Sequence, residues 1–396
     1  MKSIDREDNK INIAFLLPVP PDHNGLANNV KRFATIAKNP KFKNFIFTPT
    51  KTPEKVPGFQ IFIIKSGLLF PYTITKLILL QKIKVIDIQY NYGVYGFSNN
   101  NSIRYLSSFV NVFVLLIMCR MLKIKSVLTM HSVISDIRKE STINTIKFPR
   151  IINVTFLIFN RILVALADHI VVLTSGQYDI IAKFTSKNKL HLIHHGMDNN
   201  SFAKVDHLFF TFLYVGLIRP NKGVNYLLDA FELLNKKYNN IRLIIAGSKD
   251  SNNFAEYEKY YTDVSKKLET MKLNCNIDFF EGWYDFERIN ELISVSDAIV
   301  LPYIDRANET SGIANEFACS GLPLILSKIP RFESYFSDGE NCLLFEPGSP
   351  EDLCSAMENI MLDFKLRSRI RENLLKMTKL YSWENITNEY MELYDI

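Results

Sequence analysis

The chain has 396 residues, which is too long for one ordinary hydrophobic core, so two domains are expected. With 47% hydrophobic and 22% charged residues, the composition is that of a soluble globular protein. The net charge of +6 suits anionic substrates or an anionic membrane surface, but no block of Lys and Arg is dense enough to indicate nucleic-acid binding.

The five cysteines are scattered and lack the spacing of metal ligands, which predicts reduced thiols in a cytoplasmic protein and no metal site. The mixed-charge residues 1–10 predict no signal peptide. The longest apolar stretches, Phe109–Cys119 and Phe156–Leu166, are shorter than the roughly 20 residues that span a bilayer. We expect both to form helices buried against a sheet.

Short apolar runs alternate with segments of helical periodicity along the whole chain. In the first half these runs are Ile11–Leu17, Phe45–Thr48, Ile61–Ile64, Val85–Gln89, Ser126–Met130, His169–Thr174 and His191–His194. In the second half they are Phe209–Gly216, Ile241–Gly247, Ile277–Glu281, Ala298–Pro302, Leu322–Leu326 and Cys342–Phe345. Runs that are apolar throughout predict parallel strands buried on both faces, connected through helices in βαβ units.

The pattern predicts an α/β protein with two doubly wound, Rossmann-like parallel sheets that face each other across a cleft. The strand pattern restarts after the polar segment 198–206, which divides the chain into an N-terminal domain, residues 1–203, and a C-terminal domain, residues 204–382. A last amphipathic segment, residues 383–396, has helical spacing at Ile386, Tyr390 and Tyr394.

In open parallel sheets, ligands bind beyond the carboxyl ends of the strands. The loop after the first strand contains Gly25, which leaves room for a phosphate or an acceptor, although glycine ends many such loops for steric reasons alone. No Gly-x-Gly-x-x-Gly follows, so a nicotinamide enzyme gains no support. His131 ends another predicted strand and is a candidate polar contact in the cleft, with a purely structural role as the alternative.

The paired histidines His194 and His195 have no Cys or carboxylate at ligand spacing, so we reject a metal site there. The segment from Gly216 to Gly223 places Arg219 and Lys222 three positions apart in a turn between a strand and a helix. Such a pair can clamp a diphosphate, the Arg as a bidentate fork and the Lys as a point charge. A solvated turn is the alternative for this segment taken alone.

Trp283 follows another predicted strand and is a candidate for lining a nucleobase pocket, with core or hinge packing as the alternative. The stretch from Glu309 to Ile325 is the most informative in the chain. Ser311 and Gly312 suit a helix N-terminus that attracts an anion, and Ile313 follows them directly. Glu309 and Glu316 are seven positions apart, about 10 Å along a helix, which lets one reach a sugar and the other a ribose.

Taken together, the order and spacing of these segments resemble the GT-B fold retaining glycosyltransferases of family 4. The segments that carry the resemblance are PPDHNGLANNV, VLTMHSV, LIHHGMDNNSF, GLIRPNKGVNYLLDAF, IRLIIAGS, FEGWYDFERINELISVSDAIVLPY, ETSGIANEFACSGLPLI and YSWENI. The resemblance covers nearly the whole chain and implies that the last helix, after Trp383, crosses back to the N-terminal domain.

The resemblance also implies roles for single residues. Gly25 matches a glycine that approaches the donor diphosphate or the acceptor, and His131 matches a histidine that contacts the transferred sugar. Lys222 matches a lysine that neutralises the departing diphosphate. Glu309 and Glu316 match an acidic pair that holds the sugar and ribose hydroxyls.

The chain departs from the family pattern at two places. Leu217 stands where the family has its arginine, which here is Arg219. Glu309 is one residue too close to Glu316, and strict spacing would put Asn308 in the first acidic position. We prefer Glu309, because its distance from Gly312 matches the family pattern.

These observations predict a retaining glycosyltransferase that moves a hexose-type sugar from a nucleotide diphosphate donor, such as a UDP- or GDP-sugar, to a glycan or lipid-linked acceptor. The pathway is expected to be cell-surface polysaccharide or glycoconjugate synthesis, and no metal or cofactor is expected. Two alternatives remain: a non-catalytic paralogue that serves as a binding or activating subunit, and a GT-B enzyme that isomerises or phosphorolyses sugars.

A peripheral contact with an anionic membrane, at its inner face, is also expected. The basic residues considered for it are Lys31, Arg32, Lys38, Lys41, Lys43, Arg104, Arg120, Lys123 and Lys125. A solvated basic face explains the same residues equally well.

Overall fold

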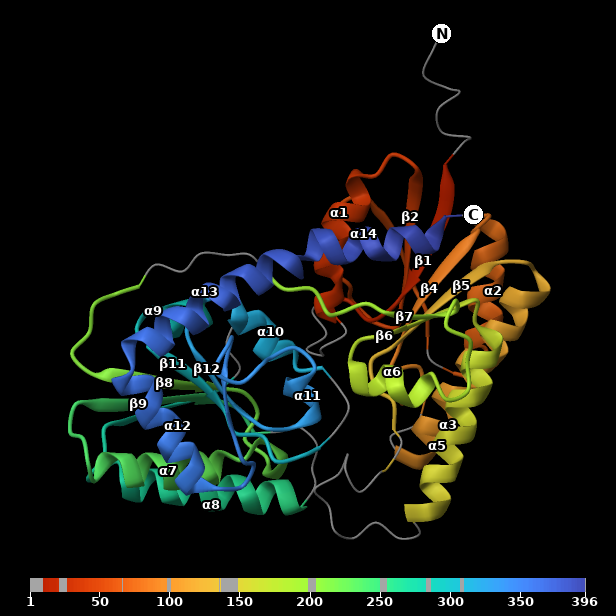
Figure 1. Ribbon diagram of the computed structural model, residues 1–396. Coiled ribbons are helices and arrows are strands. Elements are labelled where there is room, and N and C mark those ends of the chain that lie inside the picture. Colours follow the sequence, from red (N-terminus) through yellow and green to blue (C-terminus); the bar gives the residue numbers. More distant parts are fainter. Residues whose placement is uncertain are drawn as a thin grey trace.

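The structure is a computed structural model, and it describes residues 10–20, 27–65, 67–97, 101–134, 136, 149–198, 204–249, 255–282, 286–306 and 310–395. These residues form two domains, each built on one parallel β-sheet, that lie side by side (Figure 1). The strands predicted from the sequence are all present with small shifts of their ends. The largest shift is at β2, which begins at Phe42 and not at Phe45.

The first sheet has seven strands in the order β3-β2-β1-β4-β5-β6-β7. Its strands are β1 (Ile11–Leu16), β2 (Phe42–Thr48), β3 (Phe59–Ile63), β4 (Val85–Tyr90), β5 (Lys125–Met130), β6 (His169–Val172) and β7 (Leu190–Leu192). The helices of this half are η1 (Ala27–Arg32, a 3₁₀ helix), α1 (Phe33–Lys38), α2 (Phe70–Leu80), α3 (Asn101–Met121), α5 (Pro149–Leu166) and α6 (Ser175–Ile181).

The second sheet has six strands in the order β10-β9-β8-β11-β12-β13. Its strands are β8 (Phe210–Val215), β9 (Ile241–Gly247), β10 (Ile277–Glu281), β11 (Ala298–Leu301), β12 (Leu324–Ser327) and β13 (Leu343–Phe345). The helices are η2 (Pro220–Lys222, a 3₁₀ helix), α7 (Val224–Asn235), α8 (Ala255–Met271), α9 (Phe286–Ser294), α10 (Gly312–Ala318), α11 (Pro330–Glu333), α12 (Pro350–Leu362), α13 (Phe364–Leu380) and α14 (Trp383–Tyr394).

Helices cover both faces of the first sheet. Successive residues of each strand point to opposite sides, so an apolar strand has side chains to bury on both faces. In β1, Ala14 and Leu16 belong to the core formed with α2, α3 and α5. Ile13 and Phe15 belong to the core formed with α1 and α14. The inner strands β1, β4, β5 and β6 are therefore buried on both sides, as their unbroken apolar runs predict, whereas the edge strand β3 is partly exposed.

Helix α14 comes from the far end of the chain but packs on the first domain. Figure 1 shows α13 on the second domain leading into α14, which lies beside α1 of the first domain. Its buried apolar residues are Ile386, Tyr390, Leu393 and Tyr394, all within the core on that face of the first sheet. At the crossing point, the Met197 N–H donates a hydrogen bond of 2.8 Å to the Tyr381 carbonyl.

A buried ion pair fixes α14 to the sheet. Arg32 Nη2 lies 2.8 Å from Asp87 Oδ2, and neither side chain is more than 1% exposed. The Tyr394 hydroxyl donates to the same Asp87 oxygen, and the Arg32 guanidinium lies 4.3 Å from the centre of the Tyr390 ring. Burial acts to lower the pKa of Arg32, but the Asp87 carboxylate with Tyr394 and Tyr390 raises it above its ordinary value. The guanidinium therefore stays charged at every pH at which the protein is folded.

We expect Arg32→Met to lower the free energy of unfolding by about 3–5 kcal/mol, because it leaves the Asp87 carboxylate buried without its partner. The double substitution Arg32→Met with Asp87→Leu should recover much of that loss, since no lone charge remains. Urea unfolding followed by circular dichroism measures both. Lys236→Met, which breaks an exposed pair with Glu232, is the control and should cost less than about 1 kcal/mol. An unfolding midpoint of Arg32→Met equal to that of this control would contradict the prediction.

Candidate active site

His131 lies directly after β5 and is held at both ends. Its Nε2 lies 2.8 Å from Gln89 Oε1, and its backbone carbonyl accepts a hydrogen bond of 3.1 Å from Gln177 Nε2. Gln177 stands on α6 and also accepts from the Leu173 N–H at 2.8 Å. Because Gln89 and Gln177 hold this buried histidine from two different elements, its ring has one orientation. A fixed orientation suits a specific contact with a ligand.

The tautomer of His131 follows from the partners of Gln89. Gln89 Nε2 donates to Asp87 Oδ1 at 2.5 Å and to Thr129 Oγ1 at 3.1 Å. Because an ionised carboxylate only accepts hydrogen bonds, the Gln89 amide nitrogen must face Asp87, and its Oε1 must face His131. The proton of His131 is therefore on Nε2, and Nδ1 carries the lone pair.

Burial lowers the pKa of His131 well below its ordinary value, and the neighbouring His195 and Arg32 lower it further. The imidazole is therefore neutral at pH 7. Asp87 and Gln89 are two positions apart in β4, so their side chains lie on the same face of the sheet. This is the face that α14 covers. One line of hydrogen bonds thus connects Tyr394 to His131.

We expect nitrogen-15 NMR of the folded protein to show His131 as the neutral tautomer protonated at Nε2. Gln89→Met removes the acceptor and should abolish this preference. Thr129→Val is the matched control, because it removes one partner of the Gln89 amide nitrogen and leaves Oε1 in place. The same tautomer in Gln89→Met and in the parent would show that Gln89 does not set it.

The turn after β8 holds Arg219 and Lys222 in the second domain. The Lys222 N–H donates to the Arg219 carbonyl at 2.9 Å, which forms the turn of η2. Gly223 follows with φ of +65°, and a Cβ there would lie 1.9 Å from the Pro302 carbonyl oxygen. Only glycine fits at this position, because the turn approaches the end of β11 so closely.

A frame of buried side chains supports this turn. Lys222 Nζ lies 3.5 Å from the centre of the Tyr303 ring, in cation–π contact. Asp305 accepts 2.7 Å hydrogen bonds from both Asn221 and Arg331, and the Arg331–Asp305 pair is almost fully buried. Lys222 and its turn are therefore held by buried side chains.

Tyr303 also connects the turn to the start of α10. Burial raises the pKa of Tyr303, while Arg331, the Ser311 hydroxyl and Arg219 act against that rise. These groups must therefore lie close to the phenol. A Cβ on Gly216 would lie 3.7 Å from Ile313 Cδ1, so the end of β8 and the first turn of α10 are in contact.

Helix α10 begins at Gly312, with Ser311 as its N-cap. Ser311 Oγ accepts from the Ala314 N–H at 3.4 Å. A Cβ on Gly312 would meet no heavy atom within 4 Å, so the space beside this helix start is open. The cations at Arg219 and Lys222, the helix N-terminus and Gly216 are thus brought together in the second domain.

Two sets of contacts join the domains near these residues. Lys31 of η1 lies 2.5 Å from Asp198 and 3.9 Å from Glu316 of α10. The Tyr335 hydroxyl accepts from the His195 N–H at 3.0 Å and donates to the Leu173 carbonyl at 2.7 Å. Glu316 therefore faces the first domain, beside the helix that follows the predicted Gly25 loop.

His195 is buried in this interface. Burial lowers its pKa from 6.5 to about 4, although the hydrogen bond with the Gly196 carbonyl opposes the shift. His195 also acts on His131, whose pKa its proximity lowers. Among the described residues, no group of three or more His, Cys, Asp or Glu side chains is placed to hold a metal ion.

We expect the protein to lose stability as the pH falls from about 6.5 to about 4. In this window the unfolded chain binds a proton at His195 that the folded chain does not bind, so the contribution is complete above pH 6.5 and is lost below it. Each pH unit costs at most about 1.4 kcal/mol for this group. Urea unfolding across the window should show a shallower slope for His195→Gln than for the parent, and equal slopes would contradict the assignment.

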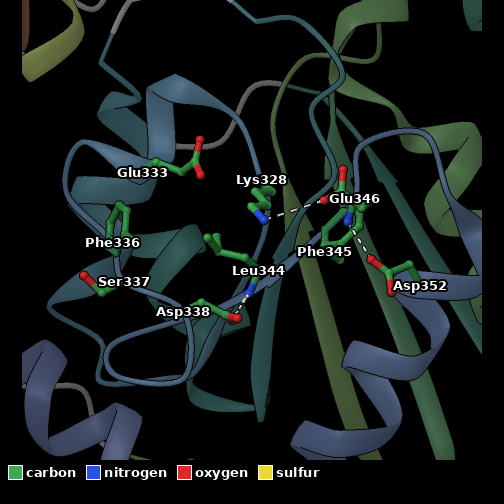
Figure 2. A pocket seen from close by; sticks show the side chains of 9 residues that line it. All are labelled: Lys328, Glu333, Phe336, Ser337, Asp338, Leu344, Phe345, Glu346 and Asp352. Atoms are coloured by element: carbon green, nitrogen blue, oxygen red, sulfur yellow. Dashed lines mark hydrogen bonds and ion pairs between the residues drawn. The ribbon is translucent and has the colours of Figure 1, made fainter.

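A separate polar hollow of about 390 Å³ lies elsewhere in the second domain (Figure 2). The predicted site residues do not line it. Asp338 and Asp352 on its wall accept hydrogen bonds from the Leu344 and Glu346 backbone N–H groups, at 2.8 Å and 2.6 Å. Its several carboxylates would repel a diphosphate, so we place no donor there.

Three of the predicted residues, Gly25, Trp283 and Glu309, lie outside the described residues, as does the alternative Asn308. Sequence reasoning missed the supporting residues of the second domain. Tyr303 and Asp305 follow β11 and carried the same strand-end signal as His131. Arg331 and Tyr335 carried no spacing signal, because only the fold brings them to the interface.

The paired parallel sheets, with a C-terminal helix that returns to the first domain, define the GT-B fold. Sucrose-phosphate synthase from Thermosynechococcus elongatus superimposes with a TM-score of 0.74 at 17% identity, over 97% of this chain and 98% of that one. Anabaena HepE, solved in complex with UDP, superimposes with a TM-score of 0.70 at 13% identity, over 97% and 99%.

Residues 201–377 match the family Glycosyl transferases group 1. Lipopolysaccharide 1,2-N-acetylglucosaminetransferase of Salmonella typhimurium is 27% identical over 186 residues, which are 46% of this chain and 46% of that enzyme. The matches span about half the length of the curated relatives. The family match thus lies in the second half of the chain, and the fold extends over both halves.

Proposed function

We propose that the protein is a retaining glycosyltransferase of family 4. It moves a hexose-type sugar from a nucleotide diphosphate donor to a glycan or lipid-linked acceptor. The observation that carries this proposal is the cluster of Arg219, Lys222 and the α10 N-terminus on the buried frame of Tyr303, Asp305 and Arg331. The match of this half of the chain to Glycosyl transferases group 1 supports it.

Arg219 and Lys222 would stabilise the leaving nucleoside diphosphate. In sugar transfer the bond between the anomeric carbon and a diphosphate oxygen breaks, and negative charge develops on that oxygen. Cations and a helix dipole already fixed in place stabilise this charge without reorganisation, which lowers the barrier. We propose that these groups act without a metal ion. The acceptor oxygen bonds to the anomeric carbon, and its proton goes to the departing diphosphate.

His131 would act on the sugar from the first domain. A neutral imidazole with a fixed Nε2–H can contact the positively charged, oxocarbenium-like sugar through its lone pair without adding a like charge. Glu316 would hold the ribose hydroxyls, with Glu309 facing the sugar and Gly25 near the donor or acceptor. Trp283 would line the base pocket, and Ser311, Gly312, Ile313 and Gly216 would form the wall beside the diphosphate.

Donor and acceptor classes follow from the similar proteins. The UDP bound by HepE supports a UDP-sugar donor, with a GDP-sugar as the alternative. The Salmonella relative acts on lipopolysaccharide, which supports an acceptor of the glycan or lipid-linked type and a role in polysaccharide synthesis. We also propose that the protein works in the cytoplasm, at the inner face of a membrane where such acceptors are presented.

We expect Lys222→Ala to lower kcat for sugar transfer by about 10²–10³-fold, because it removes a cation from the developing charge. In the parent, UDP or GDP at a hundred times its Kd should raise the melting temperature by a few degrees, from about 2.7 kcal/mol of binding free energy. That shift should be much smaller in Lys222→Ala.

Lys222→Met keeps the packing on Tyr303 and removes only the charge, so it separates electrostatics from stability. Lys236→Ala, an exposed lysine at the end of α7, is the matched control and should behave as the parent does. Normal turnover in Lys222→Met would refute the proposed role. A parent that no nucleotide stabilises would refute the proposed donor site.

A further inference from the structure

Helices α2, α3 and α5 lie together on one side of the first domain (Figure 1). Their outer faces carry exposed apolar side chains, which form an apolar surface. We define this apolar surface by two residues on each helix, all between 43% and 67% exposed: Tyr72, Leu79, Leu106, Val110, Val154 and Ile158. On each helix the two residues are four or seven positions apart, so they share one face.

The three helices that carry this surface pack side by side, α2 on α3 and α3 on α5. Tyr72, Leu106 and Val110 line one hollow of about 390 Å³ between α2 and α3. Helix α5 lies against α3 through Phe159 and Phe109, whose rings stack 3.8 Å apart. The surface therefore extends across three helices, which is larger than the isolated apolar residues common on protein surfaces.

The fold itself does not require this surface. The inner faces of the same helices already fill the core with residues such as Ile74, Leu115 and Leu163. By length and composition α3 and α5 could each cross a membrane, and only 22% of α5 is buried. The prediction that these apolar stretches are buried helices is thus correct for their inner faces only.

The charges on the three helices all have one sign. Their sequences contain no Asp or Glu, and their charged residues are Lys76, Arg104, Arg120, Arg150 and Arg161, all exposed. Among the described residues from 67 to 166, the acidic ones are Asp87, which is buried, and Asp136. An apolar surface with basic residues around it complements an anionic lipid bilayer, where apolar side chains enter the interface and basic ones reach the phosphates.

A second copy of the chain fits this surface less well. A symmetric dimer would pair the surface with itself and bring the same basic residues of both copies together. Like charges across such an interface destabilise it. An anionic bilayer turns the same charges into attraction.

The structure also corrects which basic residues are available. Arg32 is buried against Asp87, and Lys31 and Lys41 pair with Asp198 and Asp395. Of the basic residues considered from the sequence, Arg104 and Arg120 stand on the helices of the apolar surface. The basic residues available for the expected membrane contact are thus different from the full set considered from the sequence.

We propose that the apolar surface docks on a bilayer that contains anionic lipid, with α2, α3 and α5 lying along the membrane surface and not across it. The proposal names the face for the proposed membrane location, but it does not depend on sugar transfer. Docking in this way would set the orientation of the first domain relative to a lipid-linked acceptor in the same membrane.

Flotation of the full chain with liposomes tests the proposal. We expect the protein to float with vesicles of phosphatidylcholine and phosphatidylglycerol, and to stay at the bottom with phosphatidylcholine alone. The double substitution Tyr72→Glu with Leu106→Glu should lower binding at least about tenfold, because it places charge in the apolar surface. Lys76→Gln with Arg150→Gln should lower it about 30-fold on anionic vesicles.

Leu273→Glu is the matched control, since Leu273 is 81% exposed on the second domain, and it should float as the parent does. The nucleotide-induced melting shift should persist in all these variants, so loss of docking and loss of the donor site are read separately. The proposal is overturned if the parent stays at the bottom with anionic vesicles, or if Tyr72→Glu with Leu106→Glu floats unchanged. It is also overturned if sedimentation shows a parent dimer that this double substitution dissociates.

Discussion

The buried pair of Arg32 and Asp87 is the interaction on which the arrangement of the first domain depends. It joins η1, the central strand β4 and, through Tyr394, a helix that lies more than 300 positions later in the chain. Asp87 also orients Gln89, which in turn orients His131. A desolvated charge pair of this kind is costly to form and more costly to break, so it favours one arrangement over all alternatives.

The second domain also contains a buried ion pair, which supports a positively charged side chain. There the Arg331–Asp305 pair and Tyr303 support Lys222 and its turn, so the positive charge is fixed before any ligand arrives. Preorganised charge is more effective than charge on a mobile loop, because no reorganisation is needed when the ligand's own charge develops. Each domain thus uses a buried ion pair to position one polar group that the proposed reaction needs.

Among the described residues, the polar contacts between the two domains near these residues come from widely separated segments. Lys31 reaches Glu316, and Tyr335 bridges His195 and Leu173. Together with helix α14, which packs on the first domain, these contacts hold the two domains in their relative position. The apolar surface lies on α2, α3 and α5, which cover the face of the first sheet opposite α1 and α14. The proposed lipid contact and the domain contact therefore use different faces.

The sequence by itself determined the strands, their parallel order within βαβ units and the candidate cations, because apolar runs and strand-end residues are local signals. It also predicted a helix N-terminus in the turn of Ser311 and Gly312, where α10 begins with Ser311 as its N-cap. Only the tertiary structure decided that Arg32 is buried and not a surface cation, and that Arg331 and Tyr335 support the site. These roles depend on segments distant in sequence, and spacing along the chain carries no information about such contacts. The exposed apolar face of α5 could not be predicted for the same reason. An apolar run identifies hydrophobic residues, but it does not show which of them pack against another part of the fold.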